Sequence, residues 1–161
     1  SNNRFILGIA GGFIREAMEN HGSEFNARWD IVKSRVLQMK GDWREANSCL
    51  SRFQMPPIFI GSNSSKVPLR VAEYADGWML RKQIYKGDAL SDLRVACQRR
   101  GRPYSSVKVI LMGAPQERSE IEQEIFYGIN NFLFFSSGED KSALEDELYK
   151  LGELISNFKS N

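Results

Sequence analysis

The chain has 161 residues, of which 42% are hydrophobic and 26% charged, so it can bury a core and stay soluble. Its net charge of +2 is small and its 22 basic residues are dispersed, which argues against a nucleic-acid partner. No run of about 18 apolar residues exists, so no membrane partner is expected. Cys49 and Cys97 lack CxxC spacing and His21 is the single histidine, so we expect reduced thiols, a cytoplasmic location and no metal site.

Short apolar runs alternate with longer amphipathic stretches along the chain. The apolar runs predict buried strands at residues 4–9, 58–60, 77–80, 107–112 and 129–135. Helices are expected at residues 13–20, 26–40, 67–74, 89–100, 119–127 and 141–158. Gly41 should end the second helix, Pro68 suits the first turn of the third, and Asp88 should cap the fourth. Residues 42–57 are expected to form a loop.

The order of these elements predicts the fold class. Strands that are apolar on both faces and joined by crossover helices imply an α/β fold with about five parallel strands, each followed by helix. Two helices carry an apolar row that should face the core. These rows are Trp29, Val32, Val36, Leu37 and Met39, and Leu144, Leu148, Leu151 and Ile155. No repeat or linker is visible, so residues 1–161 are expected to be a single domain.

Two strand exits have the composition of an anion site, because ligands of parallel α/β folds bind beyond the carboxyl ends of the strands. The first is Ala10-Gly11-Gly12, where glycine lets the backbone approach a ligand, although glycine also serves simply to turn the chain. The second is Gly61-Ser62-Asn63-Ser64-Ser65-Lys66, just before a predicted helix. Its short polar side chains suit either a helix cap or a phosphate cradle.

Five segments in sequence resemble motifs of the luciferase-like flavin- or F420-dependent oxidoreductase family. Residues 4–13 (RFILGIAGGF) are similar to its fourth-strand motif RxxLGxGAGW, and residues 56–63 (PPIFIGSN) to its PPIxxGGN strand. The other three are ENHG at 19–22 followed by Arg28-Trp29, ADGWM at 75–79, and GRP at 101–103 followed by VKV. Phe13 replaces a frequent Trp, Ser62 replaces a Gly, and the segment between Lys40 and Pro56 is shorter than in the family.

The resemblance implies a partial TIM (β/α)8 barrel that runs from the fourth strand to the eighth, with the N-terminal strands absent from this sequence. A whole barrel needs roughly 250 residues. An open barrel would leave strand edges unpaired at both ends, so a homo-oligomer is expected.

The resemblance also implies a cofactor site. Its expected members are Ala10, Gly11, Gly12, Phe13, Gly61, Ser62, Asn63, Ser64, Ser65 and Arg28. Arg28 matches a family arginine that reaches phosphate in some members, and its alternative is a salt bridge on the helix surface. His21 is either an active-site acid or an ordinary loop residue. No catalytic acid or base is assigned.

The implied function is an oxidoreductase of the luciferase-like monooxygenase type, using reduced FMN or coenzyme F420 on a small-molecule substrate. This chain would supply the loops that bind the cofactor phosphate. The alternative is a non-catalytic flavin-binding or interaction module derived from the same barrel.

Overall fold

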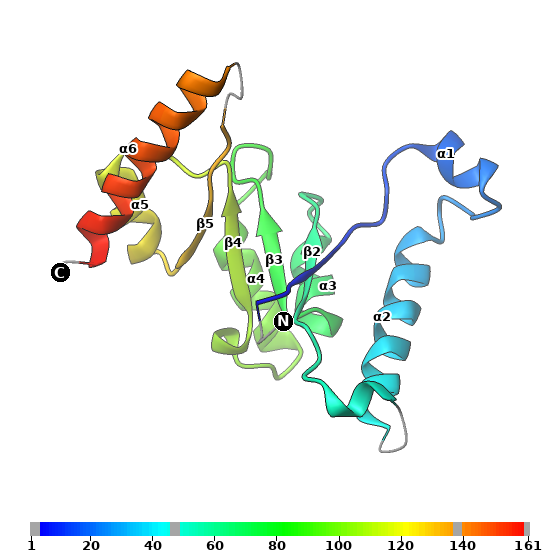
Figure 1. The fold of residues 1–161 in the computed structure, drawn as a ribbon. Coiled ribbons are helices and arrows are strands. Elements are labelled where there is room, and N and C mark those ends of the chain that lie inside the picture. Colours follow the sequence, from blue (N-terminus) through cyan, green and yellow to red (C-terminus); the bar gives the residue numbers. More distant parts are fainter. Residues whose placement is uncertain (1–3, 46–48, 137–139, 160–161) are drawn as a thin grey trace. The chain divides into compact units, whose positions relative to one another are not determined.

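The structure is a computed structural model that describes residues 4–45, 49–136 and 140–159. The chain divides into two compact units, Ser1–Lys108 and Val109–Asn161. Strands and helices alternate throughout both units, and strands of the same unit pair in parallel (Figure 1). The α/β class and the five parallel strands are thereby confirmed. The expectation of a single domain stays a prediction, because two compact units can belong to one partial barrel.

The first unit contains three strands and the helices that follow them. The strands pair in the order β1-β2-β3. Its elements are β1 (Leu7–Ile9), α1 (Arg15–Asn20), α2 (Arg28–Arg44), the short 3-10 helix η1 (Cys49–Arg52), β2 (Ile58–Gly61), α3 (Val67–Tyr74), β3 (Gly77–Leu80), α4 (Ala89–Arg99) and η2 (Tyr104–Ser106). The predicted bounds of α3 and β3 are confirmed, Asp88 caps α4 by accepting the Ser91 N–H, and β1 begins three residues later than expected.

The core of this unit lies between β2, β3 and the helices α3 and α4. The side chains of β2 and β3 supply its largest buried groups, with Phe59 and Trp78 at most 1% exposed. Helix α3 contributes Val67 and Val71, and α4 contributes Leu93, each 0% exposed. Helices α3 and α4 also pack directly on each other. Continuous apolar runs in the two short strands are the reason they can be covered so completely.

Asp76, the residue just before β3, forms hydrogen bonds to several neighbouring elements. Its backbone N–H donates to the Ile58 carbonyl at 2.7 Å, and its carboxylate accepts the Ile58 N–H at 2.9 Å. The other carboxylate oxygen binds the Lys40 ammonium group of α2 at 2.9 Å. The Asp76 carbonyl accepts the N–H of Lys108 at 3.1 Å. One residue therefore fixes the start of β2 relative to β3 and to the end of α2.

Helix α2 differs from its prediction, because it continues past Gly41 to Arg44. Trp43 in this last turn lines a cavity of about 270 Å³ with Phe53 and neighbouring residues of the segment 53–57, so tertiary packing extends the helix. The predicted apolar row is also corrected. Val36 is its single buried member, and Leu37 is about half exposed.

The second unit contains β4 (Lys108–Met112, whose first residue falls in the first unit), α5 (Arg118–Phe126), β5 (Asn131–Leu133) and α6 (Lys141–Lys159). After β4, the N–H groups of Gly113 and Ala114 both donate to the Leu133 carbonyl. Strand β5 is shorter at both ends than the predicted 129–135. None of the helices traced over the described residues combines the length and apolar character needed to cross a bilayer.

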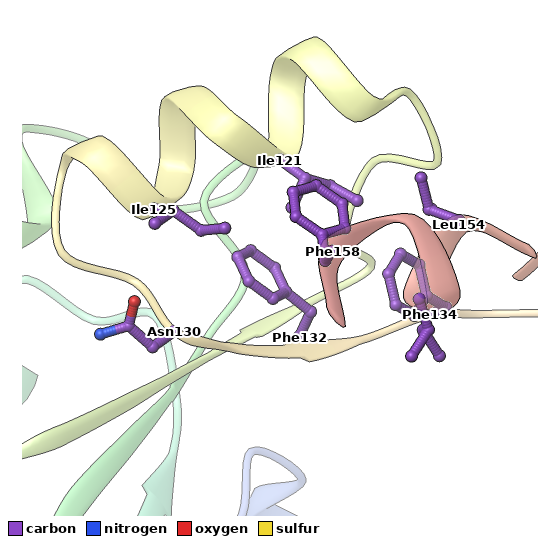
Figure 2. A pocket seen from close by; sticks show the side chains of 8 residues that line it. Ile121, Ile125, Asn130, Phe132, Phe134, Leu154 and Phe158 are labelled. Atoms are coloured by element: carbon purple, nitrogen blue, oxygen red, sulfur yellow. The ribbon is translucent and has the colours of Figure 1, made fainter. Parts of the chain in front are cut away.

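Helix α6 does not bury the row that the sequence predicts. Leu144, Leu148 and Ile155 are exposed, Leu148 to 58%. The helix instead meets α5 and β5 through its last turns, where an apolar pocket of about 420 Å³ lies (Figure 2). The pocket is lined by Ile121, Ile125, Asn130, Phe132, Phe134, Leu154, Ile155 and Phe158. The turns around 144 and 148 lie away from this contact, which explains their exposure.

Gly77→Ala is expected to destabilise the first unit. A Cβ at Gly77 would lie 2.4 Å from the Phe59 ring and 2.6 Å from the Lys108 carbonyl oxygen, so backbone must move. Overpacking of this kind costs about 1–3 kcal/mol of unfolding free energy. Urea denaturation followed by tryptophan fluorescence, to which buried Trp78 contributes, measures this change in unfolding free energy. The matched control is Gly41→Ala, where no atom lies within 4 Å in the exposed helix and stability should rise by up to about 1 kcal/mol. Equal effects of the two variants would contradict the packing argument.

Candidate functional site

The two predicted loops lie side by side. Strands β1 and β2 pair in parallel with Ile9 opposite Ile60, so both chains leave the sheet at the same edge. A Cβ built on Gly61 would lie 3.8 Å from the Ile9 carbonyl oxygen, which shows how closely the two exits approach. The structure therefore places the starts of the two loops, at residues 10 and 61, side by side at one edge of the sheet.

The glycines of the first loop have structural roles. A Cβ at Gly11 would lie 2.7 Å from the Trp29 ring, so only glycine lets this loop pack on α2. Gly12 has φ +72°, a left-handed conformation that glycine adopts at no steric cost. Ala10 and Gly12 are exposed, and Phe13 is 88% exposed. The turning role that the sequence left open is thus present, and the backbone around Gly12 still faces solvent.

The second loop is braced by its own polar groups. The Ser62 carbonyl accepts the indole N–H of buried Trp78 at 2.8 Å. The Asn63 side-chain oxygen accepts the backbone N–H of Arg81 at 2.9 Å, which ties the loop to the exit of β3. These two residues fix the conformation of the loop. The Asn63 side-chain oxygen is already occupied by a hydrogen bond within the chain.

Ser64 and Ser65 are the members of this loop that face outward. Ser64 accepts twice from the start of α3: its hydroxyl from the Lys66 N–H at 3.4 Å and its carbonyl from the Val67 N–H at 2.9 Å. The N–H groups of Ser64 and Ser65 themselves donate to no acceptor in the part of the chain that the structure describes. Both residues are exposed and precede the positive end of the α3 dipole. This arrangement can accept a negatively charged group.

Arg28 lies beside the first loop rather than in it. One guanidinium nitrogen donates to the Phe25 carbonyl at 2.8 Å, and the guanidinium carbon lies 3.9 Å from the Phe25 ring centroid. The salt bridge that the sequence left as an alternative is not formed with any described residue, and the guanidinium stacks on Phe25 instead. His21 is exposed in the turn after α1, where its backbone N–H closes the helix on Met18.

Arg102 has a structural role that sequence reasoning missed. Its guanidinium donates to the carbonyls of Val71 and Ala75 at 2.9 and 2.7 Å, and its Nε donates to the Ser106 hydroxyl. It therefore caps the carboxyl end of α3, where a cation opposes the negative end of the dipole. The GRP motif at 101–103 pointed to this arginine without indicating its target.

The described residues contain no group of three or more His, Cys, Asp or Glu side chains that could hold a metal ion. Cys49 is exposed and Cys97 is buried, and neither is in a disulfide. Burial raises the pKa of the Cys97 thiol, which keeps it protonated and unreactive.

No protein-family model matches the chain, and no curated protein matches it.

Arg102→Met is expected to lower the unfolding free energy by about 2 kcal/mol, because hydrogen bonds from a charged group to the ends of a helix are lost. Urea denaturation followed by tryptophan fluorescence measures the change in unfolding free energy. Arg99→Met is the matched control, since Arg99 is exposed in the last turn of the neighbouring α4, and it should change stability by less than about 0.5 kcal/mol. A similar small change in both variants would show that the cap contributes nothing.

Proposed function

We propose that this chain supplies the phosphate-binding edge of a luciferase-like (β/α)8 barrel, whose whole is an oxidoreductase that uses reduced FMN or coenzyme F420. The five strands would then be the fourth to the eighth of the barrel. The observation that carries the proposal is the adjacency of the β1 and β2 exits, together with the N–H groups of exposed Ser64 and Ser65, which have no acceptor among the described residues.

The phosphate end of such a cofactor fits these residues. Backbone N–H groups and serine hydroxyls donate to phosphate oxygens, and the start of α3 adds a positive partial charge. Ser62 and Asn63 shape the loop through Trp78 and the Arg81 backbone, so the donors are held in place before a ligand arrives. A preorganised loop loses little conformational freedom on binding.

The bound cofactor would supply hydride transfer or oxygen activation. Residues 10–13 and 61–65 carry no titratable side chain, so their part is to bind and orient, and no proton transfer is assigned to them. The same observation supports the second candidate, a flavin-binding or interaction module without catalysis. Oxidation of reduced cofactor by a small-molecule substrate separates the two, because the module binds cofactor without turnover.

The surrounding barrel and its assembly are part of the same proposal. Strand β1 presents one side to β2, and strand β5 presents one side to β4. The other sides of these strands would be completed by the remaining strands of a barrel or by another copy of the protein, because unpaired edges promote association.

Titration of the complete protein with FMN, riboflavin and F420 tests the phosphate cradle. FMN is expected to bind at least about tenfold more tightly than riboflavin, since charge-assisted hydrogen bonds to the phosphate contribute roughly 1.5–3 kcal/mol. The double variant Ser64→Leu, Ser65→Leu should lose this preference, because it removes both hydroxyls and crowds the exposed N–H groups. Flavin fluorescence quenching and F420 absorbance report binding.

Ser34→Leu is the control, because Ser34 is an exposed serine on α2 outside the cradle. It should leave the preference for FMN unchanged. Absence of binding by both FMN and F420 would overturn the proposal. Equal affinity for FMN and riboflavin would remove the phosphate role while leaving a flavin site elsewhere.

A further inference from the structure

A cationic cluster that the proposed cradle does not use lies between α2 and α3. Arg28 and Trp29 begin α2, while Arg70 and Tyr74 lie one turn apart on α3. The guanidinium carbon of Arg70 lies 4.1 Å from the Trp29 ring centroid. The two helices are also joined by the Lys33–Glu73 ion pair at 2.7 Å. The cluster is therefore part of a packed interface between two helices.

Three donor atoms of this cluster are buried without an acceptor. They are Nε of Arg28, one terminal nitrogen (Nη1) of Arg70 and the hydroxyl of Tyr74. Tyr74 is 3% exposed, so its hydroxyl has lost its hydrogen bonds to water and gains none from the described residues. A buried donor without a partner destabilises a protein, and such groups call for an explanation.

The two arginines of the cluster also lack a direct ion-pair partner among the described residues. Glu73, the nearest acidic neighbour of Arg70 in sequence, is held by Lys33 at 2.7 Å and by Arg100 at 3.2 Å.

The charges at the cluster influence one another. Burial lowers the pKa of Arg70, the Arg28 guanidinium adds to this effect, and Tyr74 and Asp30 oppose it. Arginine nevertheless keeps its proton in proteins, so two positive charges face this interface. Asp30 is exposed and forms no ion pair with either arginine among the described residues. A negatively charged ligand would relieve both the repulsion and the unpaired donors.

We propose that Arg28, Arg70 and Tyr74 form a binding site for a single oxyanion, a phosphate or carboxylate group, between α2 and α3. Guanidinium groups match the planar, multidentate geometry of such anions, and the tyrosine hydroxyl adds a neutral donor. Trp29 contacts both Arg70 and the Gly11 backbone, so the anion would stiffen the support of the first loop. This site does not depend on the flavin proposal.

Isothermal titration of the complete protein with inorganic phosphate and, separately, with acetate tests the site at constant ionic strength without flavin or F420. Arg70→Met should weaken anion binding at least about tenfold, because charge-assisted hydrogen bonds are lost. Tyr74→Phe, which removes one neutral donor from a buried site, should weaken it severalfold with the fold intact. Arg70→Lys keeps the charge and loses the planar fork, so it should bind phosphate more weakly than the native protein.

A matched pair of controls lies on α4 and η2. The Arg94 guanidinium lies 5.0 Å from the Tyr104 ring centroid, and the Tyr104 hydroxyl is also buried without an acceptor. Arg94→Met and Tyr104→Phe should leave anion affinity unchanged, because the buried arginine nitrogens without an acceptor in the described part of the chain belong to Arg28 and Arg70. The Ser64→Leu, Ser65→Leu variant should also keep one anion site, which separates this proposal from the flavin cradle.

Three results would overturn the proposal. The first is that neither anion gives binding heat and Tyr74→Phe raises the thermal midpoint of unfolding. The buried donors would then destabilise the protein without binding a ligand. The second is native affinity in both Arg70 variants and in Tyr74→Phe. The third is loss of binding in the Ser64→Leu, Ser65→Leu variant alone, which would place the anion in the cradle. Binding of phosphate without acetate would support the site and identify the dianion as its ligand.

Discussion

The hydrogen bonds of Asp76 set the register on which the candidate site depends. Its backbone and carboxylate hold both polar groups of Ile58, its carboxylate binds Lys40, and its carbonyl accepts from Lys108. All four contacts lie where β2 and β3 begin. These contacts fix the register of β2 against β3. The register in turn determines which residues lie next to each other at the opposite ends of the two strands. At that edge, the loop after Gly61 is joined to the exit of β3 by the hydrogen bond from the Arg81 N–H to the Asn63 side chain.

Helix α3 transmits this anchoring to the loop. Arg102 satisfies carbonyls at its carboxyl end, and Ser64 satisfies N–H groups at its amino end. A short helix of 8 residues has little stability alone, so its direction depends on these caps and on the buried Val67 and Val71. The dipole that would attract an anion at Ser65 is held in place by a cation some two turns away.

Local signals predicted the centre of the first unit, and tertiary contacts decided the rest. The continuous apolar run before Gly61 and the proline at the first turn of α3 act over a few residues, and β2, α3 and β3 appear where the sequence placed them. Gly41 failed as a helix stop because Trp43 packs beyond it. The stacking of Arg28 on Phe25 and the bond from Asn63 to Arg81 join side chains to partners that no spacing rule identifies.

Contacts within the chain also account for the two glycines of the first loop. Gly11 is explained by the Trp29 ring and Gly12 by its positive φ, so neither glycine requires a ligand. The proposed binding of phosphate therefore depends on the N–H groups of Ser64 and Ser65, which have no acceptor among the described residues. Backbone donors recognise the charge and shape of a phosphate and make no contact with the ring system at the other end of the cofactor. Under the proposed function such a cradle would accept FMN and F420 alike, so selection between them would have to come from groups that contact the ring.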